Sequence, residues 1–168
     1  QTDVRVISVG LDGYHHGQNY LKENADDNGE PLLNHKGRFD SFDTASFERD
    51  LELFKKEEEV AFPIYSRKTH EPVAGLAACK KEEPVLLILD GLWLLYDKKP
   101  WTNLYPFYDY KIFFHAPADV LKKNTIERHV RGGKGSSEES TAFYESSDAK
   151  NTELIINNIG KHDLDFSW

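Results

Sequence analysis

The chain has 168 residues, 39% of them hydrophobic and 30% charged, with a formal net charge of −8. This composition predicts one soluble globular domain with a full hydrophobic core. The negative charge argues against a broad nucleic-acid interface, and no apolar run approaches the roughly 20 residues of a membrane span. The single cysteine, Cys79, excludes an internal disulfide framework and favours a reducing compartment, so we expect a cytoplasmic protein.

The chain begins with a strand pattern and a long polar excursion. Residues 4–9 are typical of a strand, and residues 10–16 form the loop that leaves it. Residues 17–42 are polar and predict a surface excursion. Excursions longer than about 12–15 residues are usually functional or mobile.

A helix is expected from Ala45 to about Lys56, with Asp43 or Thr44 as its cap. Its apolar stripe repeats at i, i+4 and i+7 and consists of Phe47, Leu51 and Phe54. Short extended pieces are expected at 62–65 and 74–78, with a polar loop between them.

Five consecutive apolar residues, 85–89, predict a strand that is buried on both faces, as in the centre of a parallel sheet. Asp90 and Gly91 follow at its carboxyl end, where ligands bind in open α/β sheets. A carboxylate at that point can hold Mg²⁺, directly or through water, beside the phosphates of a nucleotide. The alternative is a core strand that ends in an ordinary turn.

The second half of the chain alternates strands and helices. Residues 110–115 predict a strand, and a helix follows from Pro117 to about Val130. A capping box at Ser136 and Glu139 begins another helix, which reaches about Ser146. A fourth strand is expected at 152–156 and a short terminal strand at 164–168. This alternation predicts an α/β fold with a mostly parallel sheet and helices on both faces.

Asp12 lies between Leu11 and Gly13, just beyond the first strand. The glycine lets the backbone turn and a ligand approach closely. If strand 4–9 neighbours strand 85–89, Asp12 and Asp90 lie near each other at one edge of the sheet. One of them could then act as a general base on a substrate hydroxyl while the other attends a metal ion. The alternative is an Asx-type turn without chemistry.

Tyr14, His15 and His16 crowd the same loop. Adjacent residues project apart and no carboxylate or cysteine stands at a zinc spacing, so hydrogen bonding to a polar substrate is favoured over metal ligation. Tyr65 and Arg67 follow an extended piece. A guanidinium there can bind a phosphate or a substrate hydroxyl, and the alternative is an ordinary surface arginine.

Arg128, Arg131 and Lys134 lie at the end of a helix and across two glycines. Basic residues are expected at any helix C-terminus because of the helix dipole. The alternative is a hinged lid that closes over phosphates.

A phosphate-binding loop requires G-x-x-x-x-G-K-[ST]. The Gly-Lys pairs of this chain stand at 133–134 and 160–161, and Gly135 and His162 follow them, so neither pair fits. The chain also begins at Gln1 and contains no methionine. We therefore expect the sequence to be incomplete at its start.

Five segments, in the same order along the chain, resemble the P-loop small-molecule kinases of the uridine kinase, pantothenate kinase and phosphoribulokinase superfamily. The similarity is greatest to its fructokinase-like or nucleoside-kinase-like branch. The segments are Leu11-Asp-Gly-Tyr-His15 with Asn19 (D-G-F-H-x-x-N in the branch), 36–43 (K-G-x-P-x-x-F-D), 63–67 (P-x-Y/F-D-R), 87–97 (I-I-E-G-N-Y-L-L-x-D), and the lid-like run 128–134 with 147–151.

The resemblance implies one kinase-like domain over residues 1–168 with a lid around 128–146. It implies a three-layer, P-loop NTPase-like fold that lacks its N-terminal strand, glycine-rich loop and helix. The implied activity is ATP- and Mg²⁺-dependent phosphoryl transfer to a hydroxyl of a nucleoside, a sugar or a pantothenate-like molecule.

The resemblance also implies roles for individual residues. Asp12 would be the catalytic base, and Arg128 and Arg131 would stabilise the transferred phosphoryl group. Asp90 would lie near Mg²⁺, where the family usually has Glu. The implied acceptor site consists of Tyr14, His15, Arg38, Tyr65 and Arg67. The implied nucleotide contacts are Arg128, Arg131, Lys134 and Asn151. Ser66 replaces the family's Asp, and Phe39 stands where proline is common, so the acceptor stays open.

Without the phosphate-binding loop, the chain would bind ATP poorly and expose apolar surface beside strand 85–89. An alternative is therefore a non-catalytic binding or partner protein that kept the fold, and a different α/β enzyme is a further one. We expect a small-molecule substrate and neither a nucleic-acid nor a membrane partner, and a homodimer stays open.

Overall fold

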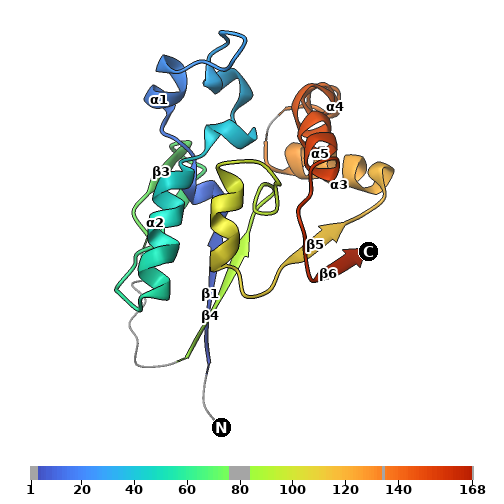
Figure 1. Cartoon of the computed structure of the whole chain (residues 1–168). Coiled ribbons are helices and arrows are strands. Elements are labelled where there is room, and N and C mark those ends of the chain that lie inside the picture. The colour runs from blue at the N-terminus through green and yellow to red at the C-terminus, as the bar shows by residue number, and fades with distance from the viewer. Residues whose placement is uncertain (1–3, 76–83, 134, 168) are drawn as a thin grey trace. The chain divides into compact units, whose positions relative to one another are not determined.

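The computed structural model describes residues 4–75, 84–133 and 135–167 (Figure 1). These residues form two compact units. The first unit is built from the chain up to Leu94 together with Lys98–Tyr108, and the second from Leu95–Asp97 together with the chain from Asp109 onward. None of the helices in the described ranges is long and apolar enough to cross a membrane.

The first unit contains a parallel strand pair that confirms the α/β class. β1 (Arg5–Gly10) lies beside β4 (Val85–Asp90), in a register that runs from Arg5 opposite Val85 to Gly10 opposite Asp90. Since the strands are parallel and in register, both carboxyl ends lie at the same edge. In Figure 1 the two strands run side by side.

The strand 85–89 was expected to be buried on both faces, and this is wrong for the described structure. Leu86 and Ile88 of β4 are 52% and 46% exposed, and Val6 of β1 is 58% exposed. The side chains alternate between the faces of the two-stranded pair, because successive residues of a strand point to opposite sides. One face of the strand pair therefore exposes apolar side chains. This exposure agrees with the separate expectation that a chain without the phosphate-binding loop exposes apolar surface beside strand 85–89.

A second strand pair in the first unit is antiparallel. β2 (Ile64–Ser66) pairs with β3 (Glu71–Val73) across a short turn. β3 lies where a polar loop was expected. The sequence did not predict this strand, because Val73 is its only strongly apolar residue and one residue makes no alternating pattern. The extended piece expected at 74–78 falls mostly on residues 76–83, outside the described residues.

The longest helix of the first unit, α2 (Thr44–Lys55), begins where the sequence predicts. The Asp43 side chain accepts a hydrogen bond from the Ser46 backbone N–H at 2.9 Å, so Asp43 is the cap. Phe47 and Leu51 are buried, and Phe54 is half-buried. The other helical segments of this unit are η1 (Leu11–Tyr14), α1 (Gln18–Glu23), η2 (Leu32–His35), η3 (Phe39–Ser41) and η4 (Trp101–Phe107).

The core of the first unit is built around large side chains from distant parts of the chain. Its fully buried hydrophobic residues are Leu21, Phe47, Trp93, Trp101 and Leu104. Leu21 belongs to α1, within the polar segment 17–42, and Phe47 belongs to α2. The buried Leu21 side chain anchors the segment 17–42, which is therefore not a free surface loop.

The second unit contains the parallel pair of β5 (Ile112–His115) and β6 (Leu164–Ser167), which confirms both expected strands. Its helices are α3 (Ala118–Arg131), α4 (Ser137–Phe143), the π-helix η5 (Tyr144–Asp148) and α5 (Ala149–Ile156). The capping box of Ser136 and Glu139 is present with both of its hydrogen bonds.

The fourth strand expected at 152–156 is wrong, because these residues form the second half of α5. These five residues include only three apolar ones, Leu154–Ile156, and so short a run cannot distinguish strand from helix by its periodicity. The helix that precedes it continues without a stop signal, and the Asn157 backbone N–H still donates to the Glu153 carbonyl at 3.1 Å. Continuity with η5 thus decided the conformation.

Candidate functional site

The carboxyl ends of β1 and β4 bring two carboxylates to one edge of the first unit. Gly10 and Asp90 are register partners, and Asp12 follows Gly10 by two residues in η1. The Asp12 side chain is 64% exposed, and Asp90 is exposed as well. The two strands are neighbours, as the expected proximity of Asp12 and Asp90 requires.

Two glycines at this edge allow the chain to pack closely on itself. A Cβ atom at Gly13 would lie 2.2 Å from the carbonyl oxygen of Pro63, and one at Gly91 would lie 2.4 Å from the Cβ of Leu11. Gly13 was expected to leave room for a ligand. In the structure that room is taken by the backbone that leads into β2. Gly13 therefore lets residues 11–16, called the strand-end loop from here on, pack against the β2–β3 pair.

Tyr14 points into the core of the first unit. Its hydroxyl donates a hydrogen bond to Asp50 Oδ2 at 2.9 Å, and its ring packs against Phe47 at 4.4 Å between centroids. Burial and the Asp50 carboxylate raise the pKa of Tyr14 far above its usual value. The structure thus separates Tyr14 from the exposed edge and makes it an anchor for η1.

Asp50 is a residue that the sequence analysis missed. It lies on α2 three residues after Phe47 and next to Leu51, which places a carboxylate on the buried side of the helix. A buried carboxylate requires partners, and it has them in the Tyr14 hydroxyl and in the Arg49 guanidinium at 3.0 Å. Its position in the apolar stripe was the signal that could have revealed it.

His15 is packed beside Asp12. Its Nδ1–H donates to the Asp12 carbonyl oxygen at 3.0 Å, and Nδ1 lies 3.8 Å from the Asp12 carboxylate. The residue is only 8% exposed, and its ring lies 4.0 Å from the Phe42 ring and 5.4 Å from the Tyr65 ring. Burial lowers the pKa of His15, so the imidazole is neutral near pH 7 and its Nε2 can accept a hydrogen bond.

Arg38 binds carboxylates of its own segment. Its guanidinium donates to Asp26 Oδ2 at 3.0 Å and to both carboxylate oxygens of Asp40. The Asp26 side chain is only 4% exposed. Arg38 was assigned to the acceptor site by resemblance, and the structure shows its charge compensated by two acids that hold the excursion 17–42 together.

Tyr65 and Arg67 lie on and just after β2, and they differ in their surroundings. Tyr65 is half-buried and faces His15, and the Lys36 Nζ atom lies 5.2 Å from its ring centroid. Arg67 is exposed, and its side chain has no hydrogen bond or ion pair within the described part of the chain. Lys36 stood in one of the quoted segments, but the sequence analysis gave it no role.

The basic residues of the expected lid lie in the second unit. Arg128 and Arg131 are exposed on the last turn of α3, and the Arg131 Nε–H donates to the Glu127 carbonyl at 3.4 Å. That contact is typical of an arginine at a helix end. Asn151 lies half-buried on α5, and Lys134 lies outside the described residues.

No group of three or more histidine, cysteine or acidic side chains within the described ranges could hold a metal ion. Magnesium requires no such cage, because it keeps several waters and binds through one or two carboxylates and the phosphates of a nucleotide. The exposed Asp90 at the end of β4 fits that requirement as a single carboxylate donor.

No protein-family profile matches the chain. An uncharacterized Escherichia coli protein, YggC, is 34% identical over 159 residues, which cover 95% of this chain and 62% of that protein. A proposed uridine kinase from Schizosaccharomyces pombe is 28% identical over 138 residues, which cover 80% and 57%. A pantothenate kinase from Psychromonas ingrahamii is 29% identical over 149 residues, which cover 84% and 44%. The chain thus spans about half the length of these curated relatives.

Solved structures share the fold. A proposed fructose transport system kinase from Silicibacter sp. TM1040 superposes with a TM-score of 0.83 and 26% identity, over 96% of this chain and 74% of the other. YFH7 from Saccharomyces cerevisiae, a proposed P-loop kinase with a circular permutation, gives a TM-score of 0.80 with 19% identity, over 97% and 58%. The relatives and the shared fold are consistent with the P-loop small-molecule kinase superfamily that includes uridine kinase and pantothenate kinase.

Proposed function

We propose that the protein is an ATP- and Mg²⁺-dependent phosphotransferase that acts on a hydroxyl group of a small molecule. The observation that carries the proposal is the register of β1 with β4, which brings the ends of both strands, and with them Asp12 and Asp90, to one edge. Parallel sheets bind their ligands at that edge. The kinases among the relatives agree with this reaction class.

In this proposal Asp12 accepts the proton of the acceptor hydroxyl. Its exposed carboxylate can reach a bound alcohol, while the buried contact with His15 holds the backbone that carries it. A carboxylate in this role orients the oxygen for attack and takes up its proton as the bond to phosphorus forms. The neutral His15 adds no positive charge beside the Asp12 carboxylate.

The residues around Asp12 suit the remaining parts of the reaction. Asp90 would hold Mg²⁺ directly or through water, and the bound ion would neutralise charge on the phosphates. Tyr65 and Arg67 would contact the acceptor. Arg128 and Arg131 of the second unit, with Lys134 and Asn151, would contact the nucleotide as parts of a lid around 128–146. Tyr14 would act only through the position of η1, because its hydroxyl is bound to Asp50.

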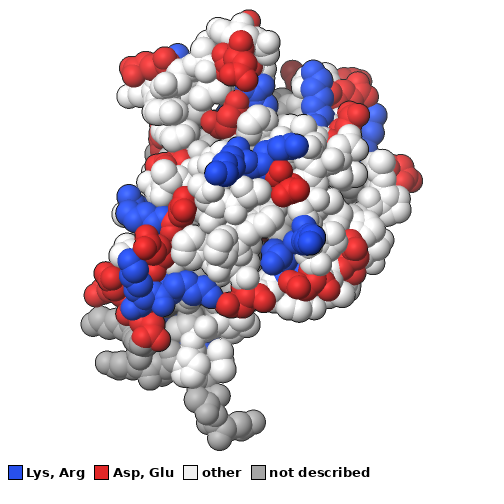
Figure 2. Space-filling view, viewed as in Figure 1, with Lys and Arg blue, Asp and Glu red and all other residues white. Residues whose placement is uncertain are grey.

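The acceptor and the cellular setting belong to the same proposal. Relatives and structural neighbours are named for uridine, pantothenate and fructose transport, so nucleosides, pantothenate-like molecules and sugars are the acceptors to test first. On the face drawn in Figure 2, acidic and basic side chains are interspersed, which is consistent with a small-molecule substrate in preference to nucleic acid. A cytoplasmic location, where ATP and Mg²⁺ are supplied, fits the single cysteine.

The decisive experiment uses the full-length protein with ATP, Mg²⁺ and a panel of these acceptors, and measures acceptor-dependent ADP formation. We expect transfer to at least one acceptor. Asp12→Asn should lower kcat by roughly 10²–10⁴-fold, because proton acceptance is lost, while ADP binding measured by calorimetry is retained. Near-normal turnover in Asp12→Asn would contradict the assignment of the base. Acceptor binding without any transfer would favour a non-catalytic binding protein.

A further inference from the structure

The helix that carries Arg128 and Arg131 is held in the second unit by a buried histidine. Within α3, all of which the structure describes, His129 is the only buried residue, with 4% of its surface exposed. Arg128 before it and Arg131 after it are exposed. An amphipathic helix usually buries apolar side chains, because a buried polar group costs free energy unless it has partners. The choice of a histidine at this position therefore requires a specific reason.

His129 faces the π-helix η5, which lies in an uninterrupted helical run from α4 to α5. Its Nε2 atom lies 3.5 Å from Asp148 Oδ2 at the end of η5, and its ring meets the Phe143 ring edge-on at 5.4 Å between centroids. The Asp148 side chain is 29% exposed. π-helices are rare, occur mostly as single turns within α-helices and are frequent at functional sites. Here the π-helix brings a carboxylate against the last turn of α3.

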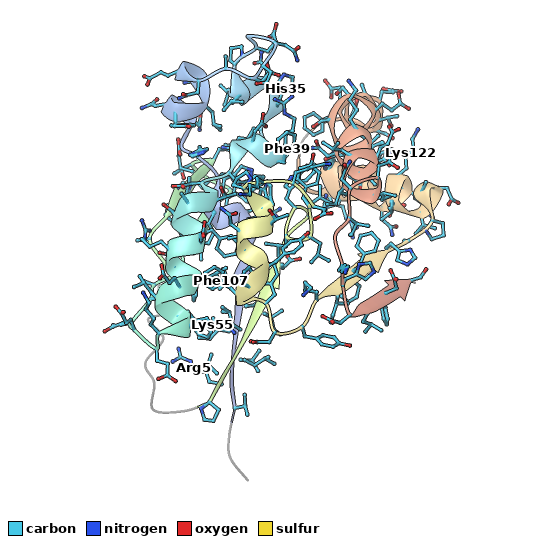
Figure 3. The ribbon with its side chains drawn as sticks, viewed as in Figure 1. Arg5, His35, Phe39, Lys55, Phe107 and Lys122 are labelled. Carbon is cyan, nitrogen blue, oxygen red and sulfur yellow. The ribbon has the colours of Figure 1, made fainter. Side chains whose placement is uncertain are left out.

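A second contact joins the same two elements at the surface. Lys122 of α3, labelled in Figure 3, donates to Glu145 Oε1 at 2.8 Å, and its Nζ lies 6.0 Å from the Tyr144 ring centroid. The side chains of Lys122 and Glu145 are 43% and 60% exposed, so water weakens their attraction. Lys122 precedes His129 by about two helical turns. The exposed pair therefore holds the first half of α3, and the buried pair holds its last turn.

We propose that His129 and Asp148 are positioning residues that fix the orientation of the last turn of α3 against η5. Arg128 and Arg131 on that turn would then point to the γ-phosphoryl group of ATP in one defined direction. A polar contact has a narrow range of favourable distances and angles, whereas apolar packing is not directional. Asp148 also precedes Asn151 of α5 by three residues, so the pair joins both segments that carry proposed nucleotide contacts.

This inference rests on the proposed function, and its test measures nucleotide binding as well as phosphoryl transfer. The Mg²⁺ complexes of ADP and of the non-hydrolysable ATP analogue AMP-PNP are titrated into the full-length protein by calorimetry. The difference between their affinities reports contacts to the γ-phosphoryl group. We expect the wild-type protein to bind AMP-PNP about tenfold more tightly than ADP, equivalent to about 1.4 kcal/mol. The kcat is measured separately with ATP and the acceptor panel.

Three variants assign the preference to the pair. His129→Leu combined with Asp148→Leu replaces both polar groups by apolar ones, so the midpoint of urea unfolding should be unchanged or higher. The preference for AMP-PNP should nevertheless be lost, and kcat should fall about tenfold with acceptor KM unchanged. His129→Gln, whose amide nitrogen can take the place of Nε2, should retain most of both. Lys122→Gln breaks the exposed pair between the same elements and should retain both in full.

The outcomes separate this inference from the proposed function. A wild-type protein without the preference would overturn it, as would Lys122→Gln with the effect of the double variant or His129→Gln without any rescue. A double variant that unfolds at lower urea would reduce the pair to a structural contact. Loss of the preference in a protein that transfers no phosphoryl group would support the pair and contradict the kinase proposal. Transfer that continues undiminished in the double variant would do the reverse.

Discussion

The strand-end loop of the first unit and the end of α3 in the second unit carry candidate functional residues in opposite ways. In the loop, Tyr14 and His15 are buried and hydrogen-bonded, and only Asp12 projects into solvent. At the end of α3, Arg128 and Arg131 are exposed, and the Arg131 guanidinium donates a hydrogen bond to a carbonyl of its own helix.

The two proposed roles, proton acceptance in the loop and charge stabilisation at the helix end, make different demands on structure. Transfer of a proton depends on a hydrogen bond of about 2.6–3.2 Å, so the group that accepts it needs a rigid support. A positive charge acts over longer distances and can be brought to a phosphate by movement of an exposed helix end. Burial and hydrogen bonding in the loop, and exposure at the helix end, are each consistent with the proposed roles of these residues.

The largest expected effect concerns Gly13. Gly13→Ala would place a methyl group 2.2 Å from the Pro63 carbonyl oxygen, and the backbone on both sides would have to move. We expect a loss of about 3 kcal/mol in the free energy of unfolding, measured by urea denaturation.

Gly10→Ala is the matched control for Gly13→Ala. It lies three residues earlier, has extended backbone dihedrals and has no atom within 4 Å of the added methyl group. It should change stability by less than about 0.5 kcal/mol. Equal effects of the two substitutions would show that the loop does not rest on β2.

A smaller effect is expected for the anchor beneath the loop. Tyr14→Phe keeps the ring against Phe47 but removes the hydroxyl that donates to Asp50, leaving one oxygen of a buried carboxylate unpaired. We expect a loss of about 1–2 kcal/mol in thermal or urea unfolding. Tyr20→Phe, on an exposed tyrosine of α1, should change stability by less than about 0.5 kcal/mol, and a similar loss there would contradict the anchoring role of Tyr14.

The smallest expected change in stability is at the exposed helix end. Arg131→Ala should leave the free energy of unfolding within about 0.5 kcal/mol, because the side chain is exposed. If it stabilises the transferred phosphoryl group, kcat should fall at least about tenfold with little change in acceptor KM. Lys123→Ala, on an exposed residue of the same helix, is the control. An unchanged kcat in Arg131→Ala would reduce Arg131 to a helix-end residue.

Much of the local structure was predictable because it depends on neighbouring residues alone. The strands at 4–9, 85–89 and 110–115 are present with shifts of one or two residues at their ends, the cap at Asp43 is one of the two expected, and the capping box forms as predicted. The segment 152–156 was misassigned, since its five residues fit either conformation and the helix before it decided the outcome.

The sequence by itself determined the α/β class, the likeness to P-loop kinases and the two carboxylates at strand ends, because hydrophobic runs and short motifs encode them directly. Only the tertiary structure decided how the polar side chains are used. It paired Arg38 with Asp26 and Asp40, placed Tyr14 on Asp50 and filled the space at Gly13 with the backbone of Pro63. The physical reason is that charge compensation and close packing depend on residues that are distant in sequence, whereas caps and hydrophobic runs are local.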